Sequence, residues 1–175
     1  MKICIVGCGA VGSLFAANLA QLEDVEVWAY DASREHVDAI NANGLRLSGA
    51  GDVLGRLSAT TDAQKLPQCD FGIVATKAMH TGPAIEATAH AFGGGCVATV
   101  QNGLGHEEAL AVQVERVIRG PTFPAGKLVE PGHVQWDVKG DTTLDPYGDR
   151  RFPDLERHAD ACARAGMPAP AVLDD

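Results

Sequence analysis

The residues most suited to chemistry end the first apolar run of the chain: Gly7-Cys8-Gly9-Ala10-Val11-Gly12. This GxGxxG pattern follows a predicted strand, opens a predicted helix and starts a β-α-β unit, which together indicate a dinucleotide-binding loop. Gly7 would allow the tight turn, Gly9 would let a pyrophosphate approach the backbone, and Gly12 would let the helix pack on the strand. The helix N-terminus then offers free N–H groups and partial positive charge. The alternative is a tight turn that binds nothing.

An acidic residue stands where such loops need one. Asp31 ends the second predicted strand, 19 residues after Gly12. A carboxylate about 20 residues after the loop binds the ribose hydroxyls of NAD and repels the 2′-phosphate of NADP. Arg34 could instead reach that phosphate. The residues therefore favour NADH and leave NADPH as the alternative, and a turn or cap role is the alternative for Asp31.

Polar residues follow two later predicted strands. Lys77 comes after one of them, and Asn102-Gly103 comes after the next. Open α/β sheets bind ligands beyond the carboxyl ends of their strands. Lys77 could therefore meet the charge of a cofactor or substrate, and Asn102-Gly103 could bind polar groups near the ribose or nicotinamide. A solvated lysine and a simple turn are the alternatives.

The histidines do not cluster in the sequence. His80 and His106 are close enough to Lys77 and Asn102 to reach the same cleft. The others are predicted at the surface or in turns: His36, His90, His133 and His158. No Ser-His-Asp arrangement or carboxylate pair stands out. The five cysteines are widely spaced and lack a second Cys or His pair, so they indicate reduced, mostly buried thiols and no metal site.

The composition bounds the class of protein. The 175 residues suffice for one domain, and 46% hydrophobic with 21% charged residues is typical of a globular chain. The net charge of -9 argues against nucleic acid or an anionic membrane as partner. No run approaches the ~18 apolar residues of a membrane span. Glycines also interrupt the only early apolar run, so we expect no signal peptide and a cytoplasmic location.

Alternating elements must position these residues. Strands are predicted at Met1–Val6, Val25–Tyr30, Phe71–Thr76 and Cys96–Gln101. Helices are predicted between and after them, near 11–22, 33–43, 81–92 and 106–114. Ser33 would cap the second of these helices, and Asn43-Gly44 would close it. The first helix has one apolar face, formed by Val11, Leu14, Phe15, Leu19 and Leu22. The alternation predicts an α/β fold with a Rossmann-type, doubly wound parallel sheet.

Shorter strands complete the prediction. Leu45–Leu47 alternates like an edge strand, and 53–59 is predicted as another short strand. Residues 127–129, 133–138 and 142–144 predict a short antiparallel extension of the fold. A last helix over 152–165 would end at Gly166.

Five segments carry a family resemblance: MKICIVGCGAVGSLFAANLA, NANGLRLSG, ATKA, QNGLG and KLVEPGHV…GDTTL. In this order and spacing, over essentially the whole chain, the sequence resembles the ketopantoate reductase (2-dehydropantoate 2-reductase) family. The resemblance implies an NADPH-binding Rossmann domain, a helical second domain and hydride transfer to the keto group of ketopantoate in pantothenate biosynthesis. It implies Gly7, Gly9 and Gly12 at the pyrophosphate, and catalytic assistance from Lys77 and Asn102 near the nicotinamide.

Two features depart from this family. NADPH-using members commonly have a basic residue where this chain has Asp31. Their general-acid lysine lies on a helix of the second domain, whereas no lysine follows Lys139 here. We therefore expect a dinucleotide-binding domain over 1–168, the start of a linker over 169–175, and no helical second domain. Such a chain would bind a dinucleotide and be inactive by itself.

Three alternatives stay open. The chain could belong to an NAD-dependent oxidoreductase of another 2-oxo or 2-hydroxy acid. It could be a non-catalytic nucleotide-binding module. It could also form a homodimer through the face that a second domain would cover. A small-molecule 2-oxo acid is the expected substrate in the enzyme readings.

Overall fold

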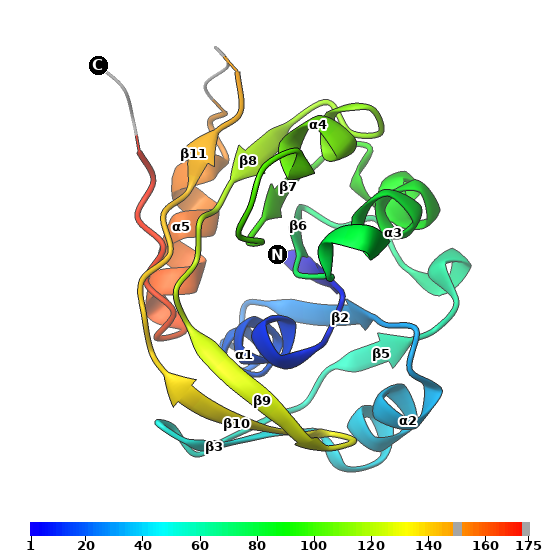
Figure 1. Cartoon of the computed structure of the whole chain (residues 1–175), viewed down its shortest axis with the longest axis vertical. Coiled ribbons are helices and arrows are strands. Elements are labelled where there is room, and N and C mark those ends of the chain that lie inside the picture. Colours follow the sequence, from blue (N-terminus) through cyan, green and yellow to red (C-terminus); the bar gives the residue numbers. More distant parts are fainter. Residues whose placement is uncertain (149–151, 173–175) are drawn as a thin grey trace.

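The computed structural model describes residues 1–148 and 152–172, in which seven strands form the main sheet (Figure 1). In spatial order they are β11 (Asp145–Pro146), β8 (Val117–Arg119), β7 (Cys96–Thr99), β6 (Phe71–Val74), β1 (Lys2–Val6), β2 (Glu26–Tyr30) and β5 (Ser58–Thr60). All neighbours pair in parallel except β11, which runs antiparallel to β8. The chain builds outward from β1 in both directions, which confirms the doubly wound sheet.

A smaller sheet lies apart from the main one. Its order is β4 (Val53–Gly55), β3 (Leu45–Gly49), β10 (His133–Val138) and β9 (Ala125–Glu130). The antiparallel β9–β10 hairpin confirms the predicted extension. The prediction of an edge strand at Leu45–Leu47 is wrong, because β10 pairs in parallel with β3 from the far end of the sequence. A pairing at that separation leaves no mark on the local alternation of residues.

Two other short segments differ from their predictions. Residues 53–59 form two strands, β4 and β5, which belong to different sheets. The segment 142–144 forms only isolated bridges, from Thr142 to Thr122 and from Leu144 to Ala171. Ala171 belongs to the predicted linker, of which 173–175 lie outside the described residues.

Helix α1 (Ala10–Leu19) lies between the two sheets (Figure 1). It contacts β1 and β2 on one side and β3, β4, β9 and β10 on the other. Every residue from Gly12 to Leu19 is buried, so the prediction of a single apolar face was too narrow. A helix covered on both sides is buried around most of its circumference, and its two polar side chains, Ser13 and Asn18, donate to backbone carbonyls.

The remaining helices surround this core. They are α2 (Arg34–Asn43), α3 (Thr81–Thr88), α4 (His106–Ala111) and α5 (Leu155–Arg164), with 3₁₀ turns at Ala63–Lys65, Ala78–His80 and Ala89–Phe92. As predicted, Ser33 caps α2 by accepting a hydrogen bond from the His36 N–H, and Gly44 ends it at φ +84°. None of the described helices is long and apolar enough to span a membrane.

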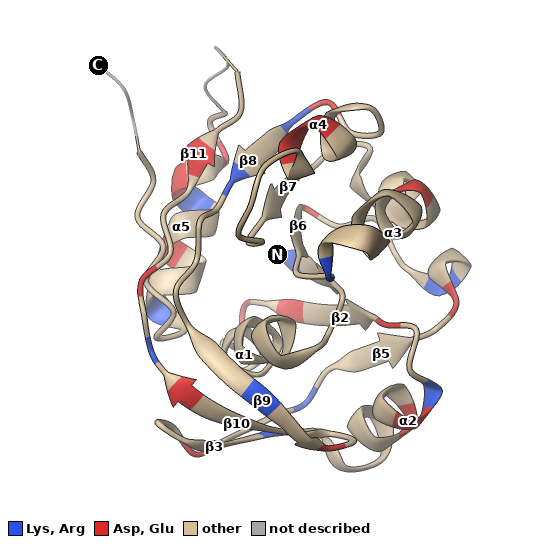
Figure 2. Cartoon of the chain, in the orientation of Figure 1, with Lys and Arg blue, Asp and Glu red and all other residues tan. Residues whose placement is uncertain are grey.

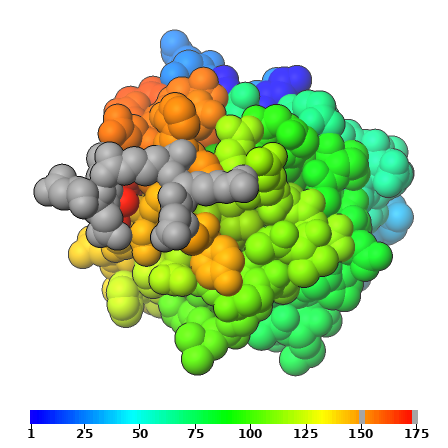
Figure 3. Space-filling view, turned by 90° about the horizontal axis from the view of Figure 1, so that it is seen from above, coloured from blue at the N-terminus to red at the C-terminus, as the bar shows by residue number. Residues whose placement is uncertain are grey.

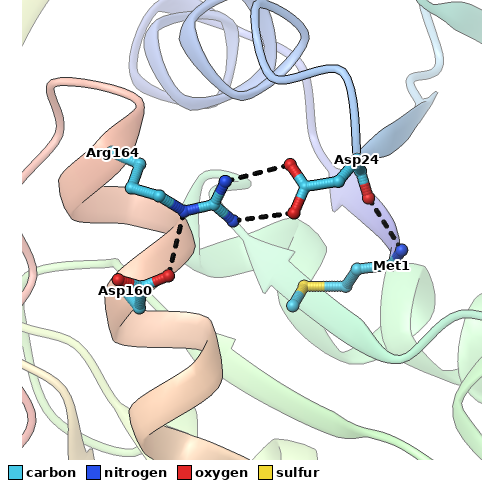
Figure 4. Close-up of polar contacts among 4 residues, drawn as sticks. All are labelled: Met1, Asp24, Asp160 and Arg164. Carbon is cyan, nitrogen blue, oxygen red and sulfur yellow. Dashed lines mark hydrogen bonds and ion pairs between the residues drawn. The ribbon is translucent and has the colours of Figure 1, made fainter.

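Helix α5 is tied to the rest of the molecule by charged contacts. Arg164 donates to both carboxylate oxygens of Asp24 at 3.0 Å, and the N-terminal amine of Met1 donates to the Asp24 carbonyl (Figure 4). The guanidinium lowers the pKa of the Asp24 carboxyl. Because these groups are exposed, they orient α5 more than they stabilise it.

The start of α5 lies beside the residue that precedes β8. Arg116 lies 3.7 Å from Asp154, the N-cap residue of α5. In the space-filling view, orange C-terminal residues border the yellow-green segment that contains β8 (Figure 3). Two central elements, α1 and β7, carry no Lys, Arg, Asp or Glu (Figure 2).

His158 on α5 was predicted at the surface, and this prediction is wrong. The residue is completely buried, and its ring stacks on Phe71 with the ring centroids 4.1 Å apart. Neither ring nitrogen has a hydrogen-bond partner among the described residues. Its place three residues after Leu155 and four before Cys162, on the inward face of α5, was the overlooked signal. Burial lowers the pKa of His158 to about 4.

This shift makes stability pH-dependent. Below pH ~6.5 the unfolded chain protonates this histidine while the folded chain keeps it neutral. The free energy of unfolding should therefore fall from pH ~6.5 to ~4, by at most about 1.4 kcal/mol per pH unit from this residue. Urea unfolding of His158→Phe should show a shallower fall, with the exposed His90→Gln as control. Equal slopes in wild type and His158→Phe would contradict this prediction.

Candidate functional site

Two adjoining cavities open at the carboxyl ends of the central strands. The larger measures about 620 Å³ and the smaller about 310 Å³, and both are lined by Ala75, Thr76 and Lys77. They lie beside β1 and β6, from which the sheet is built in opposite directions. Such a switch point is the usual ligand site of an open α/β sheet.

The glycine loop closes one wall of the larger cavity. Gly7 has φ +88°, and a Cβ there would lie 2.6 Å from Thr76 Cγ2. A Cβ on Gly12 would lie 2.0 Å from the Gly7 carbonyl oxygen. These contacts confirm the tight turn and the close packing of α1 expected from the motif.

Gly9 differs from these two glycines because a Cβ there would meet no atom within 4 Å. It is exposed at the N-terminus of α1, whose first turn has no acidic residue and no side-chain cap. No side chain of the described residues therefore caps the first amides of α1, and the space beside Gly9 is open. We call this open first turn of α1, at Gly9, Ala10 and Val11, the cradle. Its free N–H groups suit the negative charge of a phosphate group.

The backbone of Cys8 is held by hydrogen bonds to both its N–H and its carbonyl group. Its N–H donates to Asp31 Oδ2 at 2.9 Å, and its carbonyl accepts from Ser13 Oγ at 3.0 Å and from the ring of His36. Burial raises the pKa of the Cys8 thiol to about 12. The thiol lines neither cavity, so Cys8 contributes to the site through its backbone.

Asp31 lines the larger cavity in a fixed orientation. Besides the bond to Cys8, its Oδ1 accepts from the Ser33 N–H at 2.8 Å. The turn role considered from the sequence is therefore present in the structure. It is compatible with ligand binding, because a carboxylate has about four acceptor positions and these bonds use two.

Lys77 and Asn102, 25 residues apart in the sequence, line the same smaller cavity. Lys77 is exposed, borders both cavities and has no ion-pair partner among the described residues. Its ammonium group is thus free to attract an anionic ligand.

Gln101 cross-links the strand ends that carry these residues. Its Nε2 donates to the carbonyl of Thr76, and its Oε1 accepts from Thr81 Oγ1 at 3.0 Å and from Thr99 Oγ1 at 3.2 Å. The bonds join the end of β6, the end of β7 and the start of α3. Gln101 was not among the site residues predicted from the sequence, although its place immediately before Asn102 was an available signal.

The other predicted residues are divided between the cavities and their surroundings. Ala10 lines the larger cavity and Val11 the smaller. His80 and His106 line different cavities, the larger and the smaller respectively. Four predicted binding residues line neither cavity: Cys8, Gly12, Arg34 and Gly103. Arg34 is exposed on the first turn of α2.

His36 was predicted at the surface, which is wrong, because only 2% of the residue is exposed. Its ring lies between the Cys8 carbonyl and the N–H of Gly132, in the turn between β9 and β10. The spacing of His36, Val37 and Ile40 on the inward face of α2 was the available signal.

Sequence comparison identifies relatives across most of the chain. The family model described as "Ketopantoate reductase PanE/ApbA" matches residues 3–149. The 2-dehydropantoate 2-reductase of Pyrococcus abyssi is 35% identical over 161 residues, which are 91% of this chain and 52% of that protein. That of Pyrococcus horikoshii is 33% identical over 168 residues, 95% and 54% of the two chains. The chain spans about half the length of the curated relatives it matches.

Solved structures resemble the whole described fold. The PanE/ApbA family ketopantoate reductase from Ralstonia eutropha JMP134 has a TM-score of 0.87 and 28% identity, over 99% of this chain and 57% of that one. The ternary structure of D-mandelate dehydrogenase with NADH and anilino(oxo)acetate has a TM-score of 0.89 and 30% identity, over 98% and 57%.

The geometry of the two glycines predicts that Gly12→Ala and Gly9→Ala change the stability of the fold to very different extents. Gly12→Ala should lower the free energy of unfolding by about 1–3 kcal/mol or more, since its Cβ would overlap the Gly7 carbonyl. Gly9→Ala should change it by less than about 0.5 kcal/mol, as expected for an exposed substitution without a new contact. Urea unfolding monitored by circular dichroism measures both, and equal losses of stability would contradict the described packing of α1.

Proposed function

This chain belongs to the PanE/ApbA ketopantoate reductase family, and on that premise we propose that it forms the dinucleotide-binding part of an NAD(P)-dependent reductase of ketopantoate. The observation that carries the proposal is the uncapped N-terminus of α1, open at the switch point of the sheet. When bound there, a reduced nicotinamide cofactor supplies the hydride that a ketone accepts.

Different residues along the cleft bind different parts of the cofactor and the substrate. The backbone of Gly9, Ala10 and Val11 binds the pyrophosphate, and Asp31 accepts hydrogen bonds from the adenosine ribose. Lys77 and Asn102 bind charged and polar groups in the smaller cavity, toward the nicotinamide and the substrate. Holding these groups in place lowers the entropic cost of reaching a reactive geometry.

NADH is the preferred cofactor in this proposal. The Asp31 carboxylate is held in place by the N–H groups of Cys8 and Ser33, where it would repel a 2′-phosphate. Arg34, the cation considered for that phosphate, lines neither cavity. The D-mandelate dehydrogenase that resembles this chain was solved with NADH.

The same relative favours a second candidate, an NADH-dependent reductase of another 2-oxo acid, because its structure contains an oxoacetate ligand. In both cases we propose a cofactor domain over 1–168 and a linker beginning at 169. We assign no proton donor within this chain, since the family resemblance places that lysine in a second domain, and we expect no turnover from the chain alone. The cytoplasmic location and the homodimer stay predictions.

Cofactor titration tests the function directly. Calorimetry of the purified chain at fixed salt should give an NADH affinity at least about tenfold higher than that for NADPH, about 1.4 kcal/mol. Tighter binding of NADPH would overturn the Asp31 argument while retaining the cofactor-domain function. Binding of neither cofactor would overturn the function itself.

A substitution in the cradle tests where the pyrophosphate binds. Gly9→Ala places a methyl group in the open space beside the α1 amides and should weaken NADH binding at least about tenfold. The control is Gly94→Ala, because Gly94 is also exposed with no atom near its hypothetical Cβ but lies outside both cavities. Unchanged NADH affinity in Gly9→Ala would place the pyrophosphate elsewhere.

A further inference from the structure

The His36 side chain links the glycine loop to the turn between β9 and β10, two segments that are far apart in the sequence. Its Nε2 lies 2.8 Å from the carbonyl oxygen of Cys8 in the glycine loop. Its Nδ1 lies 2.9 Å from the backbone nitrogen of Gly132, in the turn between β9 and β10. The side chain is buried, so water does not compete for these bonds.

The two partners determine the protonation of the ring. The N–H of Gly132 can only donate, so Nδ1 of His36 must carry no proton. A neutral imidazole then has its proton on Nε2, and this proton is donated to the Cys8 carbonyl, which can only accept. Both ring nitrogens are thereby satisfied in a single tautomer.

Gly132 is itself held in place. Its carbonyl accepts from the Arg46 N–H at 2.9 Å, and a Cβ on Gly132 would lie 3.0 Å from Ala39 Cβ. The turn is thus bound to β3 and lies against α2. His36 therefore anchors the glycine loop to a rigid part of the small sheet.

We infer that His36 is a positioning residue for dinucleotide binding: it holds the Cys8 carbonyl inward, so that the first amides of α1 face the pyrophosphate. The inference rests on the proposed function. Ser13 Oγ donates to the same carbonyl, so loss of His36 loosens the loop without freeing it completely.

Substitution of His36 tests the inference. His36→Leu removes the donor and the acceptor, and should weaken NADH binding by about tenfold. His36→Gln keeps one donor and one acceptor at a spacing close to that of the imidazole nitrogens, and should bind within about threefold of wild type. The control is His158→Leu, because that histidine is equally buried but lies on α5, outside both cavities. Wild-type affinity in folded His36→Leu would overturn the inference.

A second readout needs no cofactor. All five cysteines are buried, and burial raises the pKa of both Cys8 and Cys162 to about 12. In His36→Leu, iodoacetamide should modify Cys8 faster than in wild type while Cys162 is unchanged, as peptide mass spectrometry would show. Equal acceleration at both cysteines would indicate general destabilisation and would overturn the positioning role.

A measurement on the wild-type chain covers the case in which His36→Leu does not fold. Long-range ¹H–¹⁵N NMR should find the His36 ring neutral with its proton on Nε2. A proton on Nδ1 would exclude the bond from Gly132 and overturn the inference. If wild type binds neither NADH nor NADPH, the proposed function fails, whereas the labelling and NMR results still decide whether His36 holds the loop.

Discussion

The position of α1 depends on one close contact, between residue 12 and the carbonyl of Gly7. Any side chain at residue 12 would overlap that oxygen, so only glycine allows the helix to approach β1. The opposite side of α1 is also close to its neighbour, because a Cβ on Gly55 would lie 2.6 Å from Ala17 Cα. Since α1 contacts strands of both sheets, small residues at these two points set the distance between the sheets.

Once α1 is in place, hydrogen bonds to a few backbone groups shape the cleft. The Cys8 peptide is bonded at both ends, which fixes the loop, and the Gln101 amide joins the ends of β6 and β7. These bonds join protein groups to one another. They leave the N–H donors at the start of α1 and the charge of Lys77 without a partner among the described residues. The first amides of α1 and the Lys77 ammonium therefore stay available, while Asp31 and Gln101, which help to shape the cleft, also line it.

A chain of net charge -9 can still attract an anion at this point. Exposed charges more than about 8–10 Å away are largely screened at physiological ionic strength. The groups nearest the cleft then dominate. They are the positive end of α1, the exposed ammonium of Lys77 and Asp31, whose carboxylate is the only one from the described part of the chain that lines either cavity. Asp31 lines the larger cavity, where, in the proposed function, it would repel the 2′-phosphate of NADPH.

Local sequence patterns by themselves determined the β1–loop–α1 unit, the Ser33 cap and the alternation of strands and helices, because these depend on residues a few positions apart. Only the tertiary structure decided the parallel pairing of β10 with β3 and the groups that the buried rings of His36 and His158 contact. It also brought Lys77 and Asn102 to one cavity. The bonds of His36 span 28 and 96 residues, and no periodicity within one element records which distant segment will cover it. The packing of distant segments thus decided which polar residues, such as His36, became buried and bonded to the backbone, and which, such as Lys77, stayed exposed at the cavities.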